Sequence, residues 1–226
     1  ENVDERVGVI ASLPTAGESA SPTVAKNAHT RITQLCGLAE KGKIAPLIMV
    51  DNEKIKKLYP KLTVKKFWTT INNTVAGLFH VFNVLANQDS EYTTFDATDY
   101  DSIMKQPGCM IMGVTSVKNL ENETAVSSAL KKNLEKTLLA EGFDLTTATG
   151  AACIVVGSEE IFEETVGLMD NIEFGFDTLA ALTGGAMVHR GIYEDDKKDK
   201  LVTYTLVSGL KRPAKRIEGL KKFLKK

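Results

Sequence analysis

The stretch from residue 67 to residue 101 constrains the fold most, because a strongly apolar segment there runs directly into a cluster of acidic residues. Apolar residues recur in this stretch at spacings of three and four, which is the period of an α-helix. They are Ile71, Val75, Leu78, Phe82 and Leu85. Phe79 and Val84 make other faces of the helix apolar too. Since a helix that is apolar nearly all round is buried, we expect it at the centre of the protein.

Polar residues stand at both ends of this helix. Trp68 and Asn72 lie one helical turn apart, on one face of its first turns. Asp96, Asp99 and Asp101 follow its end and predict an acidic loop. The sequence therefore predicts one long core helix that joins two polar sites.

The composition is that of an ordinary globular protein. With 226 residues, of which 43% are hydrophobic and 25% charged, the chain can bury a large core as one domain or as two smaller ones. No run of about 18 apolar residues occurs, so we expect no transmembrane helix. The first residues also lack the apolar segment of a signal peptide.

The cysteines and histidines point to no metal or catalytic site. The chain contains three cysteines in apolar runs, Cys36, Cys109 and Cys153. Their odd number and wide spacing predict reduced thiols in the core of a cytoplasmic protein. The chain also contains three scattered histidines, His29, His80 and His189. None of them adjoins a cysteine, and we assign them no role.

The charge is distributed unevenly. The last residues, 211–226, carry eight Lys or Arg and one Glu, which gives this tail a charge of +7 within a chain of net charge −1. Ile217, Leu220 and Leu224 form one helical stripe among these lysines. Such a pattern suits an anionic membrane, an acidic filament surface or nucleic acid, and a solvated flexible terminus is the alternative.

In the first third of the chain, the pattern alternates between strands and helices. The expected elements are a buried strand at 6–13, a loop at 14–23, a helix with the apolar stripe Val24, Ala28, Ile32 and Leu35 that ends at Gly37 or Gly42, a buried strand at 45–50 and a short helix at 52–59. Asn52 directly follows the second strand. Ligands of parallel α/β sheets gather at the carboxyl ends of strands, so this position is a candidate binding site.

The part after the acidic loop predicts a small mixed sheet covered by two helices. The expected elements are a short helix at 100–105, strands at 109–115 and 151–157, a helix at 125–141, a helix capped by Ser158, and strands at 185–193 and 201–208. The charged run EDDKKDK between the last two strands predicts a solvated hairpin tip.

Three motifs, in order, resemble those of one protein family. They are VDNEKI at the end of a strand, WTTINNTVAGLF at the start of the central helix, and TFDATDYDSIMKQPGCMIMG from the acidic loop into the next strand. With these motifs, the chain from about Arg6 to Leu210 resembles the later part of a tubulin/FtsZ superfamily protein. The resemblance implies an α/β fold: the end of a Rossmann-like GTPase domain, a long central helix, and a smaller α/β domain.

The resemblance also implies roles for five residues. Asn52 would contact a guanine base, Trp68 would stack on it, and Asn72 would bond its edge. Asp96 and Asp99 fall on the two carboxylates of the catalytic loop of the family. The implied ligands are GTP or GDP with Mg²⁺, and no protein side chain is implied as a metal ligand.

The chain departs from the family in two respects. Thr94 stands where the family has an Asn two positions before the first Asp. The glycine-rich phosphate loop, which resembles GGGTGTG in the family, occurs nowhere in this sequence. Phosphates need a cradle of backbone N–H groups, so we expect this chain to be the C-terminal part of a longer protein and to be inactive alone.

The resemblance implies assembly as well. The acidic loop of one subunit would reach the nucleotide of the next, so that hydrolysis accompanies head-to-tail filament formation. The expected organisation is the end of the nucleotide domain at 1–66, the central helix and acidic loop at 67–101, a C-terminal domain at 102–210 and the basic tail at 211–226. The alternative is a non-enzymatic module that binds a membrane, filament or nucleic acid through its tail.

Overall fold

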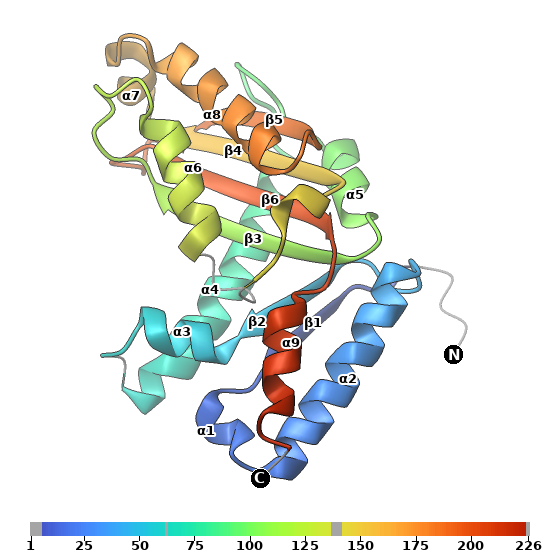
Figure 1. Cartoon of the computed structure of the whole chain (residues 1–226). Helices are drawn as coiled ribbons and strands as arrows, with labels where there is room; N and C mark the ends of the chain where they lie inside the picture. Colours follow the sequence, from blue (N-terminus) through green and yellow to red (C-terminus); the bar gives the residue numbers. More distant parts are fainter. Residues whose placement is uncertain (1–5, 62, 137–141, 225–226) are drawn as a thin grey trace.

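One six-stranded mixed sheet organises the structure (Figure 1), a computed structural model that describes residues 6–61, 63–136 and 142–224. The strands are β1 (Val9–Leu13), β2 (Leu47–Asp51), β3 (Cys109–Ser116), β4 (Gly150–Gly157), β5 (Met187–Glu194) and β6 (Val202–Leu210). Their spatial order is β1-β2-β3-β6-β4-β5. β1, β2 and β3 run parallel, β6 is antiparallel to β3 and β4, and β5 is parallel to β4. The expected α/β class with a mixed sheet is confirmed.

The two halves of the sheet are joined by a short pairing between β2 and β3. The registered pairs between β2 and β3 are Leu47 with Cys109 and Ile48 with Met110. By contrast, β3 pairs with β6 along its whole length, and so does β4 with β5. In Figure 1, β1 and β2 therefore appear as a smaller half of the sheet, and β3, β6, β4 and β5 as a larger half.

The helices cover both faces of this sheet. They are α1 (Ala16–Ser19), α2 (Pro22–Glu40), α3 (Asn52–Leu58), α4 (Val64–Leu85), α5 (Ala97–Met104), α6 (Ala125–Lys136), α7 (Glu159–Glu164), α8 (Leu168–Leu182) and α9 (Ala214–Lys221). In the view of Figure 1, α6 and α8 lie in front of the larger half, and α2 and α9 in front of the smaller half. The long helix α4 crosses behind the sheet.

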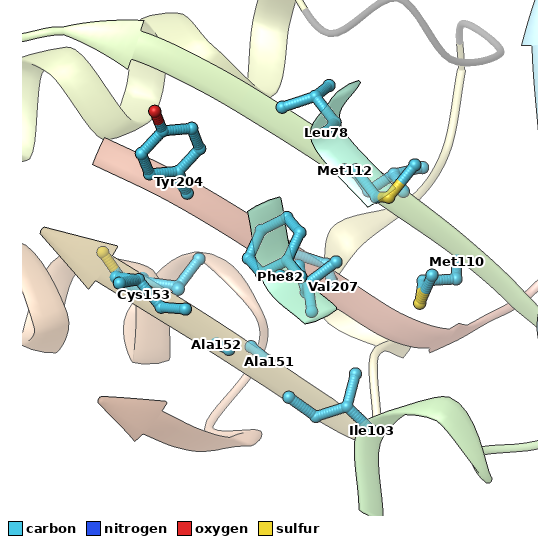
Figure 2. Packing of buried hydrophobic residues seen from close by; sticks show 14 of the residues in the cluster. Leu78, Phe82, Ile103, Met110, Met112, Ala151, Ala152, Cys153, Tyr204 and Val207 are labelled. Atoms are coloured by element: carbon cyan, nitrogen blue, oxygen red, sulfur yellow. The ribbon is translucent and has the colours of Figure 1, made fainter. Parts of the chain in front are cut away.

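One stripe of α4 packs against the sheet. The stripe consists of Val75, Leu78, Phe82 and Leu85, all buried. Figure 2 shows Leu78 and Phe82 above side chains of β3, β6 and β4. The ring of Phe82 meets that of Tyr204 edge-on, with 6.2 Å between centroids. The side chain of Ile71, which we also expected in this stripe, lies outside the described part of the chain.

Two predicted burial patterns are wrong. α4 is not buried on all sides, because Val84 is 46% exposed and Phe79 is only half-buried. The strand β1 is not buried either, since Ile10 is 54% exposed. The reason is the same for both elements. Hydrophobic periodicity identifies apolar faces, but the described residues supply a packing layer for only one face of each.

The predicted hairpin between the last two strands is also wrong. β6 inserts between β3 and β4, whereas β5 pairs with the far side of β4. The β4–α8–β5 unit explains this order, because two parallel strands joined by a helix pair directly with each other.

Two helical regions differ from expectation, and the end of a third expected helix is not described. The loop at 14–23 contains α1, which begins with a capping box of Thr15 and Glu18. The helix after Ser158 is two helices, α7 and α8, separated at Gly167, whose φ of 75° falls in the left-handed region. The helix expected at 125–141 is described as far as Lys136, and residues 137–141 lie outside the described part.

The described part of the basic tail contains α9 and is folded onto the protein. Ile217 and Leu220 of α9 are buried where α9 packs on α2. Arg216 forms a bidentate ion pair with Asp51, with Nε 2.6 Å from Oδ2 and Nη2 2.9 Å from Oδ1. Nη2 also donates to the carbonyl oxygen of Pro14 at 2.9 Å. These two members of the apolar stripe therefore face the protein, and the expectation that the stripe is open to a partner is wrong for them.

Among the described helices, none has the length and apolar character needed to cross a membrane.

Replacing Phe82 with Ala tests the packing of α4. The side chain is fully buried, so Phe82→Ala should lower the free energy of unfolding of this chain by about 3–5 kcal/mol. Urea denaturation followed by circular dichroism measures this value. Val84→Ala on the exposed side of the same helix is the control and should change it by less than about 0.5 kcal/mol. Equal losses in the two variants would contradict the packing described above.

Replacing Arg216 with Ala tests the contact between α9 and β2. Asp51 is 1% exposed, so Arg216→Ala leaves a buried carboxylate without its cation and should cost about 3–5 kcal/mol of unfolding free energy. Arg212 provides a control in the same tail, because its ion pair with Glu40 is partly exposed and is worth about 0–1 kcal/mol. The same denaturation experiment compares the two, and similar small losses would show that the Arg216 pair does not hold α9.

Candidate functional site

A pocket of about 330 Å³ opens beside the carboxyl ends of β1 and β2, next to the first turns of α4. The three residues expected to contact a guanine base, Asn52, Trp68 and Asn72, all line it. The other lining residues are Ile10, Ser12, Val50, Val75 and Ala76. The structure thus brings together three residues from two separate motifs.

Local structure explains how these side chains reach one pocket. Asp51 ends β2 and caps α3, since its Oδ1 accepts the N–H of Glu53 at 3.1 Å. The chain turns sharply there, and Asn52, which is 4% exposed, begins the helix at the wall of the pocket. Trp68 and Asn72 lie on successive turns of α4 and are more exposed. The pocket combines an aromatic face with two amides and apolar side chains.

The two aspartates of the acidic loop form a capping box at the start of α5. Oδ1 of Asp96 accepts the N–H groups of Thr98 at 2.7 Å and Asp99 at 2.8 Å. Oδ2 of Asp99 lies 3.4 Å from the N–H of Asp96. Asp96 is exposed, and its Oδ2 has no hydrogen-bond partner among the described residues. One carboxylate oxygen of this loop is therefore free to face solvent or a neighbouring molecule.

The strand β5 holds the acidic loop in place. The hydroxyl of Tyr193 accepts the N–H of Phe95 at 2.8 Å and lies within 3.1 Å of the carbonyl oxygens of Leu85 and Phe95. Burial raises the pKa of Tyr193, so the hydroxyl keeps its proton. The N–H of Ile192 also donates to the carbonyl of Thr93 at 2.9 Å. The end of α4 and the residue before Asp96 are thus tied to one strand.

His189 of β5 makes a contact that the sequence analysis missed. Its Nδ1 lies 2.7 Å from Oδ1 of Asp99, and its Nε2 lies 3.1 Å from Oγ of Ser102. Asp99 and His189 are 90 positions apart, and no local pattern marks the pair. Knowledge of the β4–β5 pairing, which brings β5 next to α5, was needed to find it.

The pocket and the acidic loop lie at opposite ends of α4. The helix has 22 residues, so it is about 33 Å long. Trp68 lies in its second turn, whereas Asp96 follows its last residue by eleven positions. The side chains around the pocket and those around the acidic loop therefore form two separate sites within one copy of the chain.

The described residues contain no group of three or more His, Cys, Asp or Glu side chains that is placed to hold a metal ion. The three cysteines are buried as free thiols, as expected for core residues.

Comparisons with known proteins agree with this architecture. A family model described as the C-terminal domain of the tubulin-like protein TubZ matches residues 93–214. No curated protein sequence matches the chain at a significant level.

Several solved structures share the fold. A structure described as type III plasmid segregation TubZ has a TM-score of 0.79 and 18% sequence identity, with 97% of this chain and 59% of that chain covered. The structure of GDP-form TubZ protofilaments of Bacillus thuringiensis serovar israelensis has a TM-score of 0.80 and 18% sequence identity, with 97% of this chain and 57% of that chain covered. The structure of a GTPγS-bound CetZ2 protofilament from Haloferax volcanii has a TM-score of 0.73 and 18% sequence identity, with 99% of this chain and 61% of that chain covered.

The chain spans less than two thirds of the length of each of these proteins. At such low identity, the structural likeness establishes the fold alone. The family model, however, matches more than half of the sequence, including the acidic loop, the larger half of the sheet and the start of α9. This chain therefore belongs to the TubZ family of tubulin-like proteins.

Proposed function

We propose that the protein of which this chain forms part binds and hydrolyses GTP and assembles head to tail into filaments. The observation that carries this proposal is that Trp68 and Asp96 are separated by most of α4, since the 17 positions from Trp68 to Leu85 span about 25 Å. Within one subunit, Trp68 and Asp96 cannot reach the same nucleotide. Two subunits stacked in the same direction bring the pocket of one against the acidic loop of the next, and such a heterologous contact propagates into a filament.

The pocket suits a guanine base. Trp68 offers a stacking face, which is worth about 1–3 kcal/mol per base. The amides of Asn52 and Asn72 each carry a donor and an acceptor, and can therefore bond both kinds of polar atom on a purine edge. The volume of about 330 Å³ is enough for a base and part of a sugar.

The phosphates need further protein. A triphosphate is held by backbone N–H groups at a helix N-terminus, typically in a glycine-rich loop, and the sequence contains no such loop. The residues present therefore fit the base but not the phosphates. We propose that the phosphate site lies in a part of the protein outside this chain, and that the chain alone does not hydrolyse GTP.

The acidic loop would act on the nucleotide of the neighbouring subunit. The outward oxygen of Asp96 can accept a hydrogen bond from water and orient it, while Asp99 fixes the backbone of the loop through the capping box. Phosphoryl transfer depends mainly on such positioning and on electrostatic stabilisation. Mg²⁺, bound with the nucleotide, would neutralise charge on the phosphates, and the carboxylates of this loop suit its hydration shell.

Among cytoskeletal roles, we propose DNA partition rather than cell division. The family match supports this choice, because one TubZ structure is described as a plasmid segregation protein. The alternative, a non-enzymatic interaction module, rests on the missing phosphate loop. Measurement of GTP binding by the complete protein separates the two proposals, since a non-enzymatic module would not bind GTP.

Replacing Trp68 tests the base pocket in the complete protein. Trp68→Ala removes the stacking face and should weaken GTP and GDP binding about 10- to 100-fold, as measured by isothermal titration calorimetry. Trp68→Phe keeps an aromatic face and should retain most of the affinity. If Trp68→Ala binds nucleotide as tightly as the wild type, the base does not occupy this pocket.

Replacing the loop aspartates tests catalysis in the same protein. Asp96→Ala and Asp99→Ala should each leave nucleotide affinity unchanged and slow GTP turnover by about two orders of magnitude or more. Glu91→Ala, an exposed change in the same loop, is the control and should keep wild-type turnover. Wild-type turnover in both aspartate variants would remove the loop from the mechanism.

A mixture of two variants tests whether the site is shared between subunits. Asp96→Ala keeps an intact pocket, and Trp68→Ala keeps an intact loop. In a mixed filament, some pockets of the first meet loops of the second, so turnover should exceed the sum of the two variants measured alone. Turnover equal to that sum would mean that loop and pocket serve the same subunit.

A further inference from the structure

We propose that His189 is a positioning residue for the acidic loop: it clamps the carboxylate of Asp99 and thereby sets the orientation in which the loop meets the neighbouring nucleotide. This inference rests on the function proposed above. It assigns a role to a side chain of the edge strand β5, which no sequence motif marks. The observation that supports this role is the 2.7 Å contact between Nδ1 of His189 and Oδ1 of Asp99.

The donor and acceptor properties of the two groups place the hydrogen of this contact on Nδ1 of His189. An ionised carboxylate only accepts hydrogen bonds, so Nδ1 of His189 must carry a hydrogen. Oγ of Ser102 lies 2.8 Å from the carbonyl oxygen of Asp99 and 3.1 Å from Nε2 of His189. If the Ser102 hydroxyl donates to the carbonyl, Nε2 is also protonated and the ring is charged; if it donates to Nε2, the ring is neutral. In both states Nδ1 donates to Asp99.

The contact with His189 is the stronger of two constraints on the Asp99 carboxylate. The capping contact from Oδ2 to the N–H of Asp96 measures 3.4 Å, beyond the usual N–H···O range of about 2.7–3.2 Å. The contact with His189 lies within that range. It is also shielded, because the side chain of His189 is 17% exposed and that of Asp99 is 30% exposed. Without the imidazole, the carboxylate can rotate away from the N–H of Asp96.

The sequence of contacts from Ser102 through His189 to Asp99 has the connectivity of a hydrolase triad. Ser102, however, sits inside α5 with its Oγ at hydrogen-bonding distance from the carbonyl three residues earlier in the same helix. A helix carbonyl therefore competes for the proton that a nucleophile must pass to histidine. The geometry fits a clamp on Asp99 better than a nucleophile at Ser102.

Turnover by the complete protein tests the clamp. His189→Ala should lower kcat about tenfold, with KM and nucleotide affinity unchanged, because the base pocket lies at the other end of α4. His189→Asn places an amide N–H near the position of Nδ1 and should recover most of kcat. His189→Gln places its amide near the position of Nε2 and should recover less. His80→Ala, on the exposed side of α4, is the control and should retain wild-type kcat.

A purely structural role for His189 predicts a different pattern. All three substitutions remove the ring, so a packing role would affect them alike and would change their stability together. Greater recovery by Asn than by Gln, with Ala lowest, supports the clamp. Equal kcat for the three variants, or wild-type kcat in His189→Ala, would overturn it.

Nitrogen-15 NMR of this chain provides an independent test. The chain has three histidines, so the signal of His189 can be assigned by its loss in His189→Asn. We expect a protonated Nδ1 in the wild type, and a change in its shift in Asp99→Ala. An unprotonated Nδ1 that is insensitive to Asp99→Ala would overturn the inference.

The experiments separate failure of the inference from failure of the proposed function. If Asp99→Ala slows turnover while His189→Ala and His189→Asn match the wild type, the inference alone fails. If the complete wild-type protein does not hydrolyse GTP, the proposed function fails, and the clamp loses its catalytic role with it.

Discussion

The packing of one stripe of α4 against the sheet is the constraint on which the rest of the structure depends. Phe82, Leu78 and Leu85 are buried on one side of the helix, and Figure 2 shows Phe82 and Leu78 over β3, β6 and β4. Because an α-helix is stiff over its length, the same contacts fix what lies toward both ends: Trp68 at the pocket and the turn that leads to Asp96. The helix thereby holds the pocket and the acidic loop apart within one copy of the chain.

The acidic loop owes its shape to the edge strand β5. Tyr193 holds the end of α4 and the residue before Asp96 through one buried hydroxyl, and the backbone of Ile192 pairs with Thr93. His189 then reaches the side chain of Asp99 from the same strand. A loop that carries exposed carboxylates would otherwise be free to move. The contacts with β5 offset the conformational entropy that is lost when the loop is ordered, and none of them uses the free oxygen of Asp96. This arrangement leaves Oδ2 of Asp96 exposed on a rigid support.

Sequence reasoning placed side chains in one region where the determinants were local. The strand end at Asn52, the helical spacing of Trp68 and Asn72, and the loop with Asp96 and Asp99 were all found from short motifs, and the first three line one pocket. It failed where the outcome depends on pairing between distant segments. The β4–β5 pairing replaced the expected hairpin, and with it came the contact of His189 with Asp99 across 90 positions. Burial was also overestimated, because an apolar period gives no information on how many layers cover a helix.

Arg216 connects the basic tail to the strand ends beside the pocket. Arg216 binds Asp51 at the end of β2 and the carbonyl of Pro14 just after β1, so it links the two strand ends that border the pocket. Asp51 in turn caps α3, whose first residue, Asn52, lines the pocket. Since a carboxylate that is 1% exposed is stable only with its partner, displacement of α9 would leave Asp51 without its cation beside the wall of the pocket. The position of α9 and the wall of the pocket are therefore linked through one ion pair.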